Sequence, residues 1–178
     1  MKKTQPIHRR NPQSEKFFMR RALRILMAVV AMQLTAGAAF ASDADDLDRA
    51  FERSQLQIAT PDARLHRFDV WIADDDAHRA RGLMFVKQLA ADAGMLFIYD
   101  HPQQIAMWMK NTKIPLDMLF VAPDGRVARI AANTEPESLK IIESGAPVLG
   151  VIELNAGTAA KLHIQVGARV IHPAFKPK

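Results

Sequence analysis

The chain contains no cysteine among its 178 residues. This absence excludes disulfide bonds, thiol catalysis, Cys-ligated zinc and iron–sulfur clusters. No stretch forms a Gly-rich phosphate loop or a nucleophile elbow, and no two histidines have the spacing of metal ligands. The apolar run at residues 25–32 is followed by Gln33 and Thr35, so it falls short of the ~20 apolar residues of a membrane-spanning helix. What remains is a domain that must be stabilised by its apolar core.

The formal net charge of +5 is distributed unevenly along the chain. Residues 1–41 contain eight of the 24 Lys and Arg residues, with Glu15 as their sole acid. The remaining residues carry a slight excess of acids, so a nucleic-acid partner loses its electrostatic support. The sequence therefore predicts no nucleic-acid partner.

Residues 1–41 have the pattern of a secretory signal peptide. A basic region precedes the apolar run, and Ala39 and Ala41 offer small residues at a cleavage point before Ser42. We expect export, to the periplasm or the medium, after cleavage near Ala41. The alternative is an uncleaved leader, which would be the one contact that the sequence predicts with a membrane.

The rest of the chain predicts a single β domain at residues 61–173, preceded by an acidic linker or short helix at 42–60 and followed by a tail at 174–178. Apolar alternation and turn residues predict strands at residues 65–72, 94–99, 104–109, 117–121, 126–132, 148–154 and 169–172. Asp74–Asp76 and Gly82 delimit a short helix at 77–81, and a second is expected at 158–162. Six to seven short strands with two short helices predict a mostly β fold, either a β-sandwich or barrel-like.

Six motifs follow one another through this domain: Arg81-Gly82-Leu83-Met84, Gly94-Met95-Leu96-Phe97, Trp108-Met109-Lys110-Asn111-Thr112, Ile114-Pro115-Leu116-Asp117, Asp124-Gly125 and Glu153-Leu154-Asn155-Ala156-Gly157. Over residues 68–170 the chain thereby resembles the family called domain of unknown function 192. The resemblance implies a compact β-sandwich and assigns no activity. Family members often have a glutamate where Trp71 stands, and an arginine in place of the stretch 85–87.

The stretch 107–120 concentrates the unusual polar chemistry of the chain. Polar residues 110–113 interrupt two apolar segments, and burying such groups is costly unless they pair with each other or with a ligand. Lys110, Asn111 and Thr112 could bind an anion or sugar hydroxyls, with Trp108 as a stacking platform. Alternatively, Asn111 and Thr112 bond to their own backbone in a turn.

Two carboxylates, Asp117 and Glu153, alternate with apolar residues and are expected to point inward. They could form a general acid/base pair of a hydrolase or lyase, because burial separates the pKa values of such pairs. Alternatively, Asp117 accepts hydrogen bonds from the polar turn and Glu153 pairs with Arg81, whose guanidinium could also clamp an anion.

A third hypothesis concerns Met107 and Met109, which share one face if the segment is a strand. Thioether sulfurs bind Cu(I), so these two residues are candidate ligands of a periplasmic copper carrier. The alternative is that both fill the core.

The hypothesis that the sequence favours is a binding module without a cofactor. Its ligand would be a small polar or anionic molecule, with carbohydrate-derived molecules among the candidates, or a partner protein. The predicted pocket consists of Arg81, Trp108, Lys110, Asn111, Thr112, Asp117 and Glu153.

Overall fold

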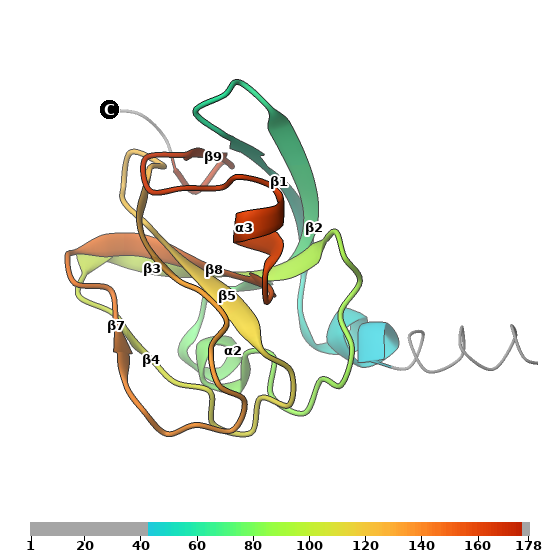
Figure 1. Ribbon diagram of the computed structural model, residues 1–178. Helices are drawn as coiled ribbons and strands as arrows, with labels where there is room; N and C mark the ends of the chain where they lie inside the picture. The colour runs from blue at the N-terminus through green and yellow to red at the C-terminus, as the bar shows by residue number, and fades with distance from the viewer. Residues whose placement is uncertain (1–42, 176–178) are drawn as a thin grey trace, which may run out of the picture. The chain divides into compact units, whose positions relative to one another are not determined.

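A computed structural model describes residues 43–175, and the predicted signal peptide lies outside the described residues. Seven strands form one sheet in the order β6-β5-β8-β3-β2-β1-β9 (Figure 1). Their bounds are β1 Arg53–Ala59, β2 Leu65–Ala73, β3 Ala93–Gln103, β5 Leu116–Val121, β6 Val127–Ala131, β8 Val148–Asn155 and β9 Arg169–Ile171. A second, two-stranded sheet pairs β4 (Ala106–Met107) with β7 (Ile142–Glu143).

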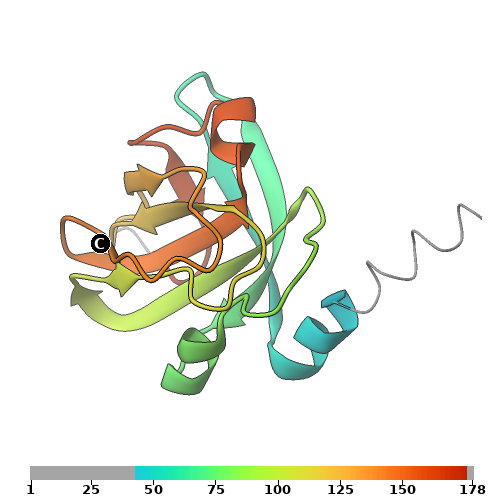
Figure 2. The same ribbon diagram turned by 60° about the horizontal axis from the view of Figure 1, so that its bottom comes forward.

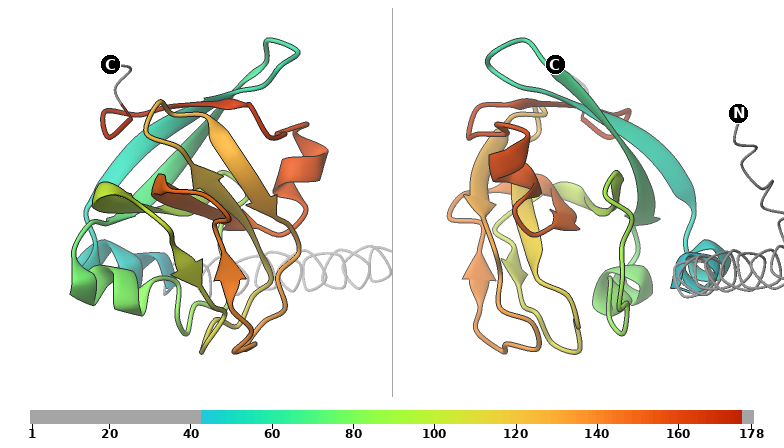
Figure 3. Two further views of the ribbon diagram at one scale, coloured as in Figure 1. Left: turned by 90° about the vertical axis from the view of Figure 1, so that its left-hand side faces the viewer. Right: turned by 45° about the vertical axis from the view of Figure 1, so that its right-hand side comes forward.

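The prediction of a mostly β fold is confirmed, and the barrel-like alternative describes it better than the sandwich. Figures 2 and 3 show one sheet that curls on itself, with α2 and the β4–β7 pair at the same end. Neighbouring strands of the large sheet pair antiparallel except β2 and β3, which pair in parallel. A parallel pair needs a crossover connection, and the segment containing α2 provides it.

Helix α2 (Asp76–Arg81) begins one residue before the predicted start and ends at the predicted residue. The Asp75 side chain accepts a hydrogen bond of 2.8 Å from the backbone N–H of His78, which caps the first turn. Gly82 ends the helix with a φ of +47°, a conformation that costs glycine little. The second predicted helix is α3 (Thr158–Lys161).

Three sequence predictions need correction. The sequence predicts a linker or short helix at residues 42–60. The structure has a helical segment at residues 43–50, but the rest of this range contains β1, which pairs along its whole length with β2. The strand predicted at 104–109 is reduced to the two residues of β4, because the chain turns after Met107. Between the strands predicted at 126–132 and 148–154, where the sequence predicts no strand, the chain contributes β7 as the partner of β4.

Apolar side chains pack on both faces of the large sheet. One core cluster includes Trp71, Met95 and Met118, and the helical segment 43–50 covers part of it with Leu47. The other cluster includes Val70 and Leu154, on the opposite face. Because side chains alternate along a strand, each polar residue of a central strand belongs to one of these two cores.

Asp117 belongs to the second core and has no exposed surface. Its Oδ1 accepts a hydrogen bond of 2.9 Å from the backbone N–H of Asn133, and its Oδ2 accepts one of 2.8 Å from the backbone N–H of Ala159. The second bond satisfies an amide in the first turn of α3, where no side chain of the helix itself provides a cap. Asp117 therefore connects β5 to α3 and to the segment after β6.

Within residues 43–175, no helix has both the length and the apolar character needed to cross a membrane.

Replacing Asp117 by alanine tests this structural role. Asp117→Ala leaves the buried N–H of Ala159 and the partly buried N–H of Asn133 without an acceptor, and hydrogen bonds to charged groups contribute about 1.5–3 kcal/mol each. We expect the free energy of unfolding, measured by urea denaturation, to fall by about 3–5 kcal/mol. A loss of less than about 1 kcal/mol would show that solvent replaces the carboxylate.

Candidate ligand-binding site

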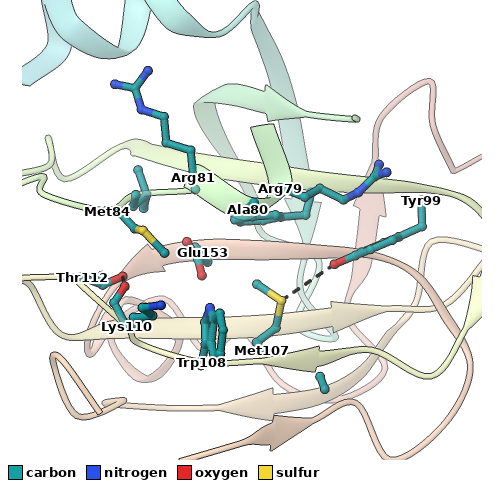
Figure 4. Close-up of a pocket in the computed structure, with 14 residues that line it drawn as sticks. Arg79, Ala80, Arg81, Met84, Tyr99, Met107, Trp108, Lys110, Thr112 and Glu153 are labelled. Atoms are coloured by element: carbon teal, nitrogen blue, oxygen red, sulfur yellow. Dashed lines mark hydrogen bonds between the residues drawn. The ribbon is translucent and has the colours of Figure 1, made fainter. Parts of the chain in front are cut away.

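A cavity of about 190 Å³ opens beside the carboxyl group of Glu153 (Figure 4). Its walls come from α2 and the residues after it, from β3, from β4 and the following turn, and from β8. Five of the seven residues predicted for the site line this cavity: Arg81, Trp108, Lys110, Thr112 and Glu153. Segments far apart in the sequence thus meet at one cavity.

Glu153 occupies a position in the sheet whose neighbours across both strands are apolar. Strand pairing places it opposite Met95 of β3 and opposite Met118 of β5, and Met95 is itself paired with Trp71 of β2. Paired residues share a face, so the carboxyl projects into the first apolar core. Only 4% of the residue is exposed.

The Glu153 carboxyl has no hydrogen-bond or ion-pair partner among the residues that the structure describes. Burial alone raises the pKa of Glu153 from its ordinary 4.5 to about 8. The group is therefore mostly a neutral carboxylic acid at pH 7, able to donate a hydrogen bond into the cavity.

The two arginines of the cavity wall direct their charges elsewhere. Arg79 donates to the carbonyl oxygens of Asp74 (2.5 Å) and Ile98 (2.7 Å) and to the carboxylate of Asp76 (2.7 Å), and so fastens α2 to β3. The Arg81 guanidinium points away from Glu153 and lies 5.1 Å from the ring centroid of Phe51. The alternative in which Glu153 pairs with Arg81 is therefore wrong.

The turn after β4 presents Trp108 and Lys110 to the cavity. It is closed by a hydrogen bond of 3.0 Å from the Thr112 N–H to the Met109 carbonyl, with Asn111 at a φ of +58°, a conformation that asparagine tolerates better than most residues. The Lys110 ammonium lies 5.3 Å from the centroid of the Trp108 ring, and Trp108 is 47% exposed. Both side chains can thus contact a ligand and solvent.

The sequence left open a turn in which Asn111 and Thr112 bond to their own backbone, and the structure shows such a bond for Thr112 alone. The Thr112 hydroxyl donates to the Lys110 carbonyl at 3.5 Å. The Asn111 side-chain amide lies outside the cavity lining and donates to the Met84 sulfur at 3.7 Å. Asn111 thereby contacts a residue of the wall.

Sequence reasoning missed several members of the wall, including Arg79, Met84, Phe97 and Tyr99. Tyr99 donates its hydroxyl to the sulfur of Met107 at 3.8 Å, and burial raises the pKa of Tyr99, so this phenol keeps its proton. The Gly-Leu-Met and Gly-Met-Leu-Phe motifs contain Met84 and Phe97 and were the available signal. Their apolar character made them look like ordinary core.

Asp117 and Glu153 do not form an acid/base pair. Strand pairing places Asp117 opposite Leu154, and therefore on the face opposite to that of Glu153. Both oxygens of Asp117 already accept backbone hydrogen bonds, and Asp117 does not line the cavity. The expectation that the two carboxylates share one pocket is wrong, which removes the basis of the hydrolase or lyase hypothesis.

Met107 and Met109 both pack in the first core cluster, although β4 ends at Met107. Met107 lines the cavity, whereas Met109 is fully buried and its sulfur accepts the Thr134 hydroxyl at 3.1 Å. This packing fits the alternative in which both methionines fill the core. Among the described residues, Asp74, Asp75 and His78 place three oxygen and nitrogen atoms within 4.8 Å of one another, but Asp75 is occupied as the cap of α2.

The two departures from the resembled family lie outside the cavity lining. Trp71 is buried in the first core and donates its indole N–H to Asp48 at 2.8 Å, so it anchors the end of the helical segment 43–50. Phe85 is exposed, with a φ of +69° and a backbone hydrogen bond to the Asn111 carbonyl. A bulky residue at positive φ is unusual, and this bond is one contact that holds it there.

Comparison with known proteins identifies the family. The model of DUF192, described as "Uncharacterized ACR", matches residues 57–172. The chain belongs to the DUF192 family. The cavity lies within the matched range, and the Trp108–Thr112 turn and Glu153 are part of this DUF192 domain.

Two crystal structures are similar to this DUF192 chain. One is of a protein from Sinorhizobium meliloti that is described as a suggested transcription regulator. Its sequence is 41% identical, and the match has a TM-score of 0.69 and covers 70% of this chain and 96% of that one. The other is of a protein of unknown function from Novosphingobium aromaticivorans, with 36% identity and a TM-score of 0.67 over 68% of this chain and 86% of that one. No curated protein matches significantly.

The neutral Glu153 predicts a dependence of stability on pH. Between pH 4.5 and about 8, the folded state retains a proton that the unfolded chain releases, so the free energy of unfolding decreases as the pH rises. Glu153→Gln removes this contribution. Relative to the variant, wild type should lose up to about 1.4 kcal/mol per pH unit in this interval.

Urea denaturation of both proteins at intervals from pH 5 to pH 9 measures the effect. The matched control is Glu135→Gln, since Glu135 is exposed and lies outside the cavity wall. Curves for wild type and Glu153→Gln that run parallel would mean that the carboxyl is ionised in the folded state.

Proposed function

We propose that this DUF192 domain is a binding module that receives a small polar or anionic ligand in the Glu153 cavity. The observation that carries the proposal is the buried carboxyl group of Glu153, which faces a cavity without a partner in the described chain. Burial of a polar group without a hydrogen bond costs about 1–3 kcal/mol in proteins. A ligand that bonds to Glu153 would recover this cost, so the site gains stability from occupancy.

The composition of the wall supports the same proposal. Met84, Phe97 and Met107 provide apolar surface, while Trp108, Lys110 and Thr112 provide a few polar groups. Polar and apolar surface thus contribute about equally to the wall, and convergent polar groups beside apolar side chains are typical of small-molecule sites. The pocket volume of about 190 Å³ limits the enclosed part of the ligand to about six water volumes.

Thermal unfolding of the purified full chain, followed by fluorimetry, tests the proposal against organic acids, sugars, nucleotides and phosphate. We expect at least one of these classes to raise the melting temperature of wild type. For that ligand, Lys110→Ala and Trp108→Ala should weaken binding at least about tenfold, the equivalent of one charge-assisted hydrogen bond.

The matched control is Lys113→Ala. Lys113 lies in the same segment but pairs with Glu137 and does not line the cavity, so its removal should leave the affinity unchanged. Equal weakening by Lys110→Ala and Lys113→Ala would indicate general electrostatic attraction and would contradict a site in the cavity.

We also propose that the domain acts outside the cytoplasm, as residues 1–41 predict. Expression of the full chain in a Gram-negative bacterium should yield a periplasmic or secreted protein whose N-terminus is Ser42, read by N-terminal sequencing. Replacing Ala39 and Ala41 by large residues should block the cleavage. Recovery of the intact chain in the cytoplasm would contradict the proposal.

A further inference from the structure

The groups that surround the Glu153 carboxyl are hydrogen-bond donors on the side of the cavity that faces it. Figure 4 shows the indole nitrogen of Trp108 at the end of the ring nearer to Glu153, with the Lys110 ammonium beside the ring. Indole and ammonium groups donate hydrogen bonds and accept none. A ligand between them and Glu153 must therefore supply acceptors to this wall.

The charges around the cavity favour a single negative charge on that ligand. From α2, Arg79 is bound to Asp76 and to two carbonyl oxygens, and Arg81 points away. From β3, Tyr99 is a neutral phenol whose pKa is raised. This leaves the ammonium of Lys110 as the uncommitted cation among the described residues that line the cavity.

Resting on the proposed function, we propose that the ligand is a compact monocarboxylate that shares one proton with Glu153 and accepts hydrogen bonds from Trp108 and Lys110. Glu153 supplies the proton in its O–H group, and the ligand supplies the charged oxygen. No bond other than the hydrogen bond forms, and any proton that Glu153 lacks comes from the solvent.

Physical chemistry favours this pair over the alternatives. A hydrogen bond from a carboxylic acid to a carboxylate is short and stronger than a neutral one, and two carboxyl groups in contact hold one proton because both cannot ionise. Burial keeps the pKa of Glu153 at about 8, so the proton is in place at neutral pH. An amine ligand would need Glu153 ionised and would face Lys110, and a phosphate dianion would need a second cation.

The wall also defines the other end of the ligand. Met84, Phe97 and Met107 form the apolar part of the wall, which suits an apolar chain beyond the carboxylate of the ligand. A volume of about 190 Å³ has room for about six non-hydrogen atoms at the volume of one water each. Short-chain acids such as butyrate fit both conditions.

Isothermal titration calorimetry of the full chain with butyrate, butyramide, butylammonium and inorganic phosphate tests the inference. We expect butyrate to bind most tightly at pH 6 and its affinity to fall about tenfold for each pH unit above the pKa of Glu153. Titrations in two buffers of different ionisation enthalpy should show almost no proton uptake at pH 6 and an uptake approaching one proton at pH 9.

Two variants distinguish the coupling between butyrate binding and protonation of Glu153 from a general effect of charge. Glu153→Gln replaces the O–H donor by an amide N–H that does not titrate, so butyrate should still bind, with an affinity that no longer depends on pH between 6 and 9. Glu135→Gln alters an exposed carboxylate outside the cavity wall, and should retain the wild-type profile.

Binding of butyrate without proton uptake at pH 9, or the same pH dependence in Glu153→Gln as in wild type, would overturn the inference. Preferred binding of phosphate, butyramide or butylammonium would overturn the carboxylate class while leaving the proposed binding function intact. An absence of butyrate binding also overturns the inference alone, because the broader ligand screen tests the binding function separately.

Discussion

Burial of the Glu153 carboxyl on an apolar row of the sheet is the constraint on which the candidate site depends. Its directly paired neighbours on the two adjacent strands are Met95 and Met118, and neither can bond to a carboxyl group. A carboxyl group in such surroundings remains neutral near pH 7 or finds a partner. The cavity beside it leaves space for that partner to come from solution.

The rest of the domain holds this arrangement in place. Arg79 fastens α2 to β3, so that the residues after the helix form one wall. The tight turn at Asn111 sets Trp108 and Lys110 against the opposite side. Asp117, on the other face of the sheet, ties β5 to α3 and supports the strand that flanks Glu153. One buried carboxyl group thus stabilises the sheet, while the other faces the cavity.

This contrast explains why the two carboxylates could not be separated from the sequence. Asp117 and Glu153 both alternate with apolar residues, and each pattern alone predicts an inward side chain. Which face counts as inward depends on the register between β5 and β8, and a shift of one residue exchanges the faces.

The sequence by itself determined the features that depend on residues adjacent in the chain. Turn and cap residues predicted α2 with its Asp75 cap and Gly82 end, and apolar alternation predicted most strands, because these features depend on neighbouring residues in the chain. Five of the seven predicted site residues do line one cavity. Tertiary structure alone decided that Asp117 lies apart, that Arg81 points away and that Met84 and Tyr99 belong to the wall. These outcomes depend on strand register and on the curl of the sheet, which bring together residues that no local pattern connects.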